Sequence, residues 1–298
     1  MSQLTSWFGT LMEWLNAYLG NYGWSIVVFT VLFRLALTPL DYYQRNTMRK
    51  QSRMMARISP KLDALKKKYQ NDPNKLNQKQ MELYKKENVS PFAGCLPMIF
   101  ILVLQFPIFI AFFNVIRNLA GEQIYEMYEL AASGEEIAPY AFLWVRNLWQ
   151  PDTFTATIFP TEGQLAGYTA TQNITDYAAV MTPWVEKFAG FRNGWGILPL
   201  AAAGFSLLQS TMAQQSSAQE NSQAQNNAGN NKMMTWMMPV MSLFFCWTSS
   251  AAFALYWTTS SIMAVLSQLV INLIFKMQDK KAAAAEVTAT VEESIINE

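Results

Sequence analysis

Five long apolar blocks restrict what this chain can fold into more than any other feature. They cover residues 24–44, 94–118, 196–215, 233–250 and 252–275. A hydrocarbon core about 30 Å thick needs roughly 20 apolar residues for each helical crossing. Because 51% of the chain is hydrophobic and only 14% is charged, the blocks can stay nearly free of charge. The sequence therefore predicts an all-α polytopic membrane protein with five transmembrane helices.

Charge is distributed unevenly between the blocks. Residues 41–90 hold 13 of the 22 Lys and Arg residues against 5 acids, whereas residues 120–195 hold 9 acids against 3 bases. Cytoplasmic loops carry an excess of Lys and Arg, so the first loop is predicted in the cytoplasm and the second outside. Lys276, Lys280 and Lys281 after the last block favour a cytoplasmic C-terminus. The N-terminus is then predicted outside.

The predicted segments follow in chain order. They are an extracytoplasmic amphipathic helix at 1–22, the first transmembrane helix at 23–44, a cytoplasmic coiled-coil hairpin at 45–92, the second transmembrane helix at 93–118, an extracytoplasmic loop at 119–195, the third transmembrane helix at 196–215, a flexible cytoplasmic loop at 216–232, the fourth and fifth transmembrane helices at 233–250 and 251–276, and a loosely ordered cytoplasmic tail at 277–298.

The N-terminal segment has apolar residues at helical spacing: Leu4, Trp7, Phe8, Leu11, Trp14, Leu15 and Tyr18. This pattern predicts a helix that lies on the outer leaflet as an interfacial helix. The first 20 residues lack the basic region and cleavage site of a secretory signal, so we expect no cleaved leader there.

The first loop carries heptad spacing at Met48, Gln51, Met55, Ile58, Leu62, Leu65 and Tyr69. That spacing predicts a coiled-coil arm. Pro60 predicts a kink or a restart, with Ser59 available as a cap. Asn71, Asp72 and Pro73 predict the turn into a shorter return arm. Composition alone does not distinguish a solvated hairpin without a partner from a hairpin that handles client proteins.

Several residue types indicate the classes of chemistry that the chain lacks. Histidine is absent, and the second to fifth apolar blocks contain no Asp or Glu. Metal chemistry, nucleophilic triads and histidine proton relays therefore lack their usual residues, and we expect no enzyme activity, metal or cofactor. Cys95 and Cys246 lie in apolar blocks and are interpreted as small buried hydrophobes. Trp144, Trp149, Trp184 and Trp195 suggest that parts of the outer loop lie at the membrane interface.

Arg34 is the residue most informative about mechanism. It lies inside the first apolar block, about 15 Å along a helix from Trp24. A charge at mid-span costs roughly 2.5 to 3.5 kcal/mol, so it should face an interior or a hydrated cavity. Its candidate neighbours are neutral: Thr30, Gln105, Trp257, Ser260 and Ser261. We therefore predict a wet, positively charged pocket open to the cytosol; an arginine that snorkels to the inner headgroups is the alternative.

Such a pocket could hold polar or acidic segments of a client while its apolar span enters lipid. A small-solute transporter or channel is the competing function, although coupled transporters usually contain intramembrane carboxylates or histidines and inverted repeats. A scaffold that holds partner spans without inserting them needs the same pocket. The sequence does not separate these last two.

The motifs resemble one family over about residues 22–276. They include GWSIVVFTVLFRLALTPL, ISPKLDALKKKY, VSPFAGCLPM, LQFPIFIAFF, FLWVRNLWQPD, MMTWMMPVMSLFF and ALYW. The chain looks like the YidC, Oxa and Alb membrane protein insertases, in particular the shorter ones of Gram-positive bacteria.

The resemblance implies five helices around a hydrophilic groove that is open to the cytoplasm and to lipid. It implies that Arg34, Thr30, Gln105, Trp257 and Ser260 line this client groove. The partners that it implies are nascent membrane-protein clients, the ribosome, the signal recognition pathway, the Sec translocon and the lipid bilayer. Two departures stand out: about one extra helical turn separates Pro97 from Gln105, and Ser250 and Ala252 replace the family's Pro and Gly before the last span.

Overall fold

The computed structural model describes residues 2–87, 96–172, 174–218 and 228–296, and over these residues the chain folds into helices and connecting loops without a β-strand. The helices are α1 (Ser2–Leu19), α2 (Tyr22–Lys68), α3 (Pro73–Lys86), α4 (Leu96–Ala132), α5 (Glu162–Leu165), α6 (Tyr177–Lys187), α7 (Ile197–Ala218), α8 (Ala228–Thr248) and α9 (Ala251–Ile296).

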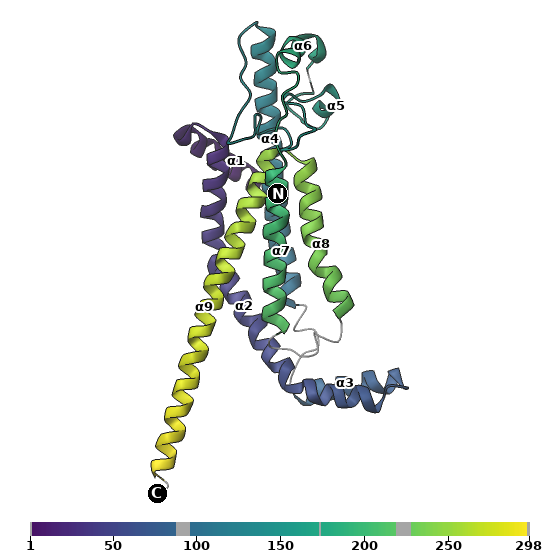
Figure 1. Cartoon of the computed structure of the whole chain (residues 1–298), viewed down its shortest axis with the longest axis vertical. Coiled ribbons are helices and arrows are strands. Elements are labelled where there is room, and N and C mark those ends of the chain that lie inside the picture. The colour runs from purple at the N-terminus through teal and green to yellow at the C-terminus, as the bar shows by residue number, and fades with distance from the viewer. Residues whose placement is uncertain (1, 88–95, 173, 219–227, 297–298) are drawn as a thin grey trace.

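The long helices form an elongated bundle (Figure 1). Helix α7 packs against α8 and α9, and α9 packs against α2. One end of the bundle is covered by residues 133–196, which we call the cap and which include α5 and α6. At the other end α3 points sideways, and the last part of α9 extends beyond its neighbours (Figure 1).

The all-helical prediction is confirmed over the described residues. Among the helices searched there, two are long and apolar enough to cross a membrane: α2, with a window of mean hydropathy 1.7, and the part of α9 from Ala251 to Ala285, with 1.6. The other three apolar blocks lie mainly in α4, α7 and α8.

Helix α2 joins two segments that the sequence analysis separated. It begins at Asn21, whose side chain accepts a hydrogen bond of 2.8 Å from the backbone N–H of Gly23. It then continues through both Pro39 and Pro60 to Lys68. The predicted restart at Pro60 is therefore wrong, because the helix is not interrupted there. Figure 1 shows α2 curving along its length, so that its lower part leaves the bundle towards α3.

The hairpin between α2 and α3 is held by a small apolar contact. Ile58 and Leu62 are buried, and Leu83 and Tyr84 of α3 pack against them. Asp72 caps α3 by accepting a hydrogen bond of 3.1 Å from the backbone N–H of Lys75. The turn lies at the Asn-Asp-Pro sequence because Pro favours the first helical turn and Asp favours the position before it.

Helix α9 contains both the last apolar block and the tail. It runs to Ile296, so the prediction of a loosely ordered tail is wrong. The sequence from Ala251 to Ile296 contains no Pro or Gly, and its end is rich in Ala and Glu, which are strong helix formers. The backbone N–H groups of Ala251 and Ala252 donate to the carbonyls of Gln150 and Leu148 in the cap, at 2.9 and 2.8 Å.

Helix α1 divides its apolar residues between two surfaces. Met12 and Leu15 are buried, and the ring of Phe8 meets the rings of Phe29 and Phe33 of α2 edge-on. A second set remains exposed: Trp7, Leu11, Trp14 and Tyr18. The interfacial helix expected from sequence therefore has one face that packs on the bundle and another that is free for a surface.

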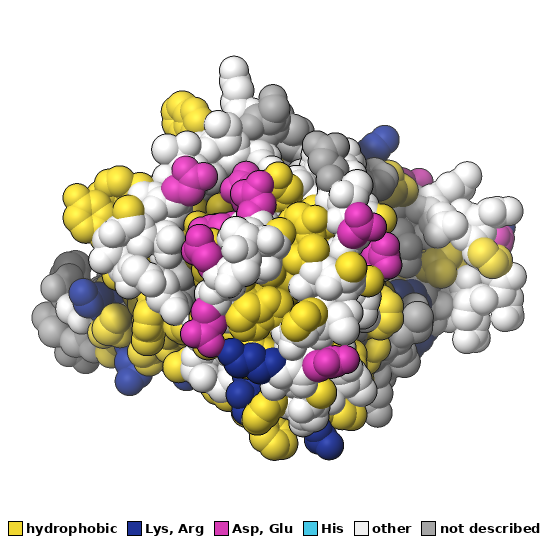
Figure 2. Space-filling view, turned by 90° about the horizontal axis from the view of Figure 1, so that it is seen from above, with side chains coloured by type: hydrophobic (Ala, Val, Ile, Leu, Met, Phe, Trp, Pro, Cys, Tyr) yellow, Lys and Arg dark blue, Asp and Glu magenta, His cyan; other side chains and the backbone are white. Residues whose placement is uncertain are grey.

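The cap is a folded unit with its own core. Residues from α4, α5, α6 and the loops pack together in this core, which contains Ile124, Met127, Ile137, Ile158, Phe159, Leu165, Tyr177 and Met181. Trp149 is 1% exposed and belongs to the main core. Its predicted interfacial position is wrong, because protein side chains surround it. Figure 2 shows acidic side chains spread among hydrophobic ones on the face of the molecule that carries the cap.

The cap is tied to the bundle by a buried carboxylate. Asp152, which is fully buried, accepts hydrogen bonds from the backbone N–H groups of Trp195 (2.9 Å), Gly196 (3.2 Å) and Leu198 (2.7 Å), and from the indole of Trp144 (3.2 Å). The carboxylate thus satisfies amides at the start of α7, where a helix favours negative charge.

Some predictions fall outside the described residues. Cys95 and the first part of VSPFAGCLPM lie there, as does the stretch 219–227 of the predicted flexible loop. The two ends of that loop are helical, in α7 and α8. Cys246 is described, and it is buried as expected.

Candidate functional site

Helix α2 carries a line of polar residues within its apolar block. Thr30, Arg34, Asp41 and Arg45 are separated by four, seven and four residues. At 3.6 residues per turn these intervals return to nearly the same face of a helix. Leu35, between them in sequence, is 54% exposed. The polar line and the exposed apolar residues therefore occupy different faces of α2.

Arg34 connects this face to α9. Its guanidinium Nε donates a hydrogen bond of 2.8 Å to the hydroxyl of Ser260, and Nη2 donates to the same oxygen. Ser260 is buried in α9, 226 positions further along the chain. The parallel packing of α2 and α9 therefore brings together two of the residues that the sequence analysis selected.

Arg34 has a neutral hydrogen-bond partner. Within the described part of the chain, no carboxylate lies within ion-pair distance of its guanidinium. Asp41 interacts electrostatically with both Arg34 and Arg45 without forming a close ion pair. Because the hydroxyl of Ser260 is neutral, it does not balance the positive charge of Arg34, which can therefore attract an anionic group.

The other three selected residues have different surroundings. Thr30 is fully buried, and its hydroxyl donates to the carbonyl of Ile26 in its own helix at 2.6 Å. The indole of Trp257 packs edge-on against Phe109 of α4, with ring centroids 5.7 Å apart. Gln105 lies one turn before Phe109, is partly buried, and makes no side-chain hydrogen bond with the described residues. The structure thus joins Arg34 to Ser260 and leaves Gln105 outside that pair.

Tyr256 is a neighbour that the sequence analysis missed. It lies one helical turn before Ser260, its ring centroid is 4.0 Å from that of Phe112, and it interacts with Ser260 and with the charge of Arg34. The spacing of four residues from Ser260 was a usable signal, because residues four apart share a helix face.

A second arginine contact was also missed. Nη2 of Arg45 lies 3.3 Å from Oε1 of Gln268 in α9. The sequence analysis assigned Arg45 to the hairpin because it follows the apolar block. Its position 11 residues after Arg34, close to three helical turns, was the signal that it shares the same face.

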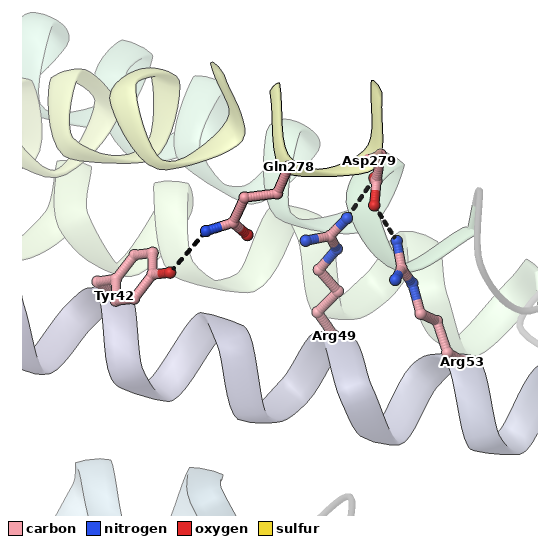
Figure 3. A network of polar contacts seen from close by, with 5 residues as sticks. All are labelled: Tyr42, Arg49, Arg53, Gln278 and Asp279. Carbon is pink, nitrogen blue, oxygen red and sulfur yellow. Dashed lines mark hydrogen bonds and ion pairs between the residues drawn. The ribbon is translucent and has the colours of Figure 1, made fainter. Parts of the chain in front are cut away.

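Below this contact, α2 and α9 are joined by a group that we call the latch: Tyr42, Arg49, Arg53, Gln278 and Asp279 (Figure 3). Asp279 accepts hydrogen bonds from Arg53 at 2.7 Å and from Arg49, while Gln278 donates to the Tyr42 hydroxyl at 3.1 Å. The bond from Arg53, together with that from Arg49, holds the pKa of Asp279 below its ordinary value.

The sequence matches the family model of the 60Kd inner membrane protein over residues 14–280. The chain belongs to this family. The match confirms the predicted resemblance to the YidC, Oxa and Alb proteins, and this family is one of inner membrane proteins. It covers nearly all of the bundle and the cap, including both ends of the Arg34–Ser260 contact.

Curated relatives in the family carry the name membrane protein insertase YidC. The chain is 31% identical over 263 residues to that of Leptospira interrogans, covering 88% of this chain and 33% of the relative. It is 30% identical over 275 residues to that of Campylobacter jejuni, with 92% and 38% covered. It therefore spans little more than a third of these relatives. The protein of Caldanaerobacter subterraneus is 28% identical over 273 residues, with 91% of this chain and 94% of the relative covered.

Proposed function

We propose that the chain is a membrane protein insertase that helps client membrane proteins enter the bilayer through a hydrated groove around Arg34. The observation that carries this proposal is the Arg34–Ser260 contact. The contact places a guanidinium with a neutral hydrogen-bond partner inside an apolar helix. Curated relatives in the family are named insertases.

The proposed membrane arrangement has five spans, with the cap outside and the hairpin and tail in the cytoplasm. It is supported by the residues that the bundle leaves exposed. Large apolar side chains face outward from α2, α8 and α9, among them Leu32, Leu35, Trp236, Phe244, Leu269 and Leu273. Such an outer surface suits contact with lipid, whereas the polar line of α2 faces α9.

The groove would act by electrostatic attraction. Moving a carboxylate through hydrocarbon is costly, and a nearby guanidinium lowers that cost. An acidic segment of a client could rest beside Arg34 while the client's apolar span moves into lipid. This action needs no covalent step, nucleotide or metal. Thr30, Gln105, Trp257 and Ser260 are the proposed groove residues around Arg34.

The proposed partners are nascent membrane proteins and the lipid bilayer, with the ribosome, the signal recognition pathway and the Sec translocon as possible sources of clients. The hairpin is the proposed client-handling element in the cytoplasm. Its surface is mostly charged, and it is joined to the bundle through the continuous helix α2.

Insertion into liposomes tests this proposal. The purified chain is reconstituted, a single-span client with an acidic tail is added, and translocation of the tail is scored by protease protection. Wild type should protect the tail, Arg34→Ala should lose protection, and Arg34→Lys should keep most of it because the charge remains. Lys276→Ala is the matched control, since it removes one exposed positive charge from α9, outside the hairpin.

Each result has a separate meaning. Protection by wild type and by Arg34→Ala alike would keep the insertase and reject Arg34 as its key residue. Protection by neither would reject insertion by the chain itself and favour a scaffold that only holds clients. Release of a trapped small solute without client insertion would favour the transporter or channel.

A further inference from the structure

Gln268 is the most deeply buried amide on the α9 face that meets α2. The residue is fully buried, yet its side-chain Nε2 has no hydrogen-bond partner among the described residues. The hydroxyl of neighbouring Ser267 is also buried without a partner there. A buried donor without a partner destabilises the folded chain, so the retention of such groups needs an explanation.

Arg45 adds a charge to these donors. Its guanidinium has five N–H groups, and the 3.3 Å contact with Oε1 of Gln268 uses one of them. The side chain is only partly buried, so a ligand can reach it. The Arg45 guanidinium and the free Nε2 of Gln268 together present several donors beside one acceptor that is already used. The chemistry that complements them is an oxyanion, such as a carboxylate.

We propose that Arg45 and Gln268 form a second oxyanion-binding station that receives carboxylates of an acidic client segment before they reach Arg34. This inference rests on the proposed insertase function. It adds a site to that function and specifies the client chemistry that the site would select.

The charge balance along α2 supports an anionic ligand at this place. Arg49 and Arg53 are both bound to Asp279 in the latch, so their charges are partly neutralised (Figure 3). Among the described residues, Arg34 and Arg45 form no close ion pair, and both interact electrostatically with the carboxylate of Asp41. Two guanidinium groups and one carboxylate leave one net positive charge, which an incoming carboxylate would balance.

The spacing of the two arginines predicts which clients benefit. Arg34 and Arg45 are 11 residues apart in one helix, which corresponds to about 16 Å along its axis. An extended chain covers about 3.3 Å per residue, so roughly five client residues separate the stations. A client with two carboxylates about five residues apart can occupy both at once, whereas adjacent carboxylates cannot.

The test uses the full chain in liposomes and three forms of one single-span client. The tail carries two Asp residues five apart, two adjacent Asp residues, or Asn at all of these positions. The variants are Gln268→Leu, Gln268→Glu and Arg45→Gln, with Arg34 intact. Lys276→Gln, at an exposed position of α9, is the charge control. Thermal unfolding of each purified variant checks that it folds.

We expect each station variant to lower protection of the client with spaced Asp residues by about tenfold relative to wild type, the loss expected for a hydrogen bond to a charged group. The Asn client should change by less than about twofold, and Lys276→Gln should change neither. Gln268→Glu should be as harmful as Arg45→Gln, because its carboxylate would occupy the guanidinium. Adjacent Asp residues should give a smaller loss.

Other outcomes would overturn the station. Equal losses for the Asp and Asn clients would make Arg45 and Gln268 a structural contact only. Losses seen with all clients in liposomes containing anionic lipid, and absent in purely zwitterionic ones, would assign the site to a lipid phosphate. If wild type inserts no client at all, the proposed insertase function is rejected. If wild type and every station variant insert all clients normally, only the second station is rejected.

Discussion

The guanidinium of Arg34 in α2 donates two hydrogen bonds to the hydroxyl of Ser260 in α9, across 226 positions of sequence. This contact fixes the charge between two helices without neutralising it, because a hydroxyl accepts hydrogen bonds but carries no charge. Substitutions of Ser260 therefore test the role of the Arg34 charge in the proposed groove.

Ser260→Asp should reduce insertion of an acidic-tailed client while leaving a neutral one nearly unchanged. The new carboxylate would form an ion pair with Arg34 and remove the charge that attracts the client. Ser260→Ala is the paired control: it leaves the guanidinium free and should cost only about 1 kcal/mol of stability. Protease protection in liposomes measures both. Full insertion of the acidic client by Ser260→Asp would contradict the attraction mechanism.

Asp152→Ala should loosen the cap from the bundle. The carboxylate is fully buried and accepts hydrogen bonds from three backbone amides and from the indole of Trp144, so its removal leaves several donors unsatisfied. We expect a loss of about 3 kcal/mol or more in the free energy of unfolding in detergent. Glu186→Ala, an exposed acid in the same cap, is the control and should have little effect. Equal effects of the two changes would show that the Asp152 network is unimportant.

Leu62→Ala should release α3 from α2. The hairpin core has few buried side chains, and Leu62 is 1% exposed in contact with α3. Truncating a buried leucine typically costs about 2 to 5 kcal/mol, and Ile58 is the other buried residue of this small cluster. Hydrogen exchange of the α3 amides should therefore accelerate strongly. Met54→Ala, at a 40% exposed position on the same helix, should leave the exchange unchanged; acceleration by both would refute this packing.

The latch should hold the tail against α2 at neutral pH and open only in strong acid. The pKa of Asp279 is lowered in the folded chain, so its stabilising contribution is fully present above the ordinary carboxylate pKa of about 3.9 and is lost as the pH falls through the lower folded value. Asp279 is about half exposed, so screening limits the contribution to under about 1 kcal/mol.

Spin labels at Lys50 and Lys280 can measure this latch. The distance between them should stay short at pH 5 in low salt, lengthen in high salt, and lengthen in Asp279→Asn at every pH. A distance that is the same in Asp279→Asn and in wild type would show that other contacts hold the tail.

The helical architecture could be derived from sequence because the relevant signals are local. Five apolar blocks, the apolar spacing in residues 2–19 and the turn at residues 71–73 each report on a few neighbouring residues. The same local reasoning failed where two patterns met: α2 continues past Pro60, and the alanine-rich tail extends α9 to Ile296. In the tail, hydropathy falls while helical propensity stays high, so α9 continues. At Pro60 the local propensity is unfavourable, and the unbroken helix there is accompanied by tertiary packing of Ile58 and Leu62 against α3.

By itself the sequence determined the helical class, the isolation of Arg34 in an apolar block, and Ser260 as a candidate neighbour. Only the tertiary structure decided that Arg34 meets Ser260, that Arg45 meets Gln268, and that Asp152 ties the cap to α7. The role of all five selected residues in a groove stays a prediction; they are Arg34, Thr30, Gln105, Trp257 and Ser260. The physical reason is that a contact between two helices depends on their relative rotation and depth. These are set by the packing of many side chains at once, and no single stretch of sequence records them.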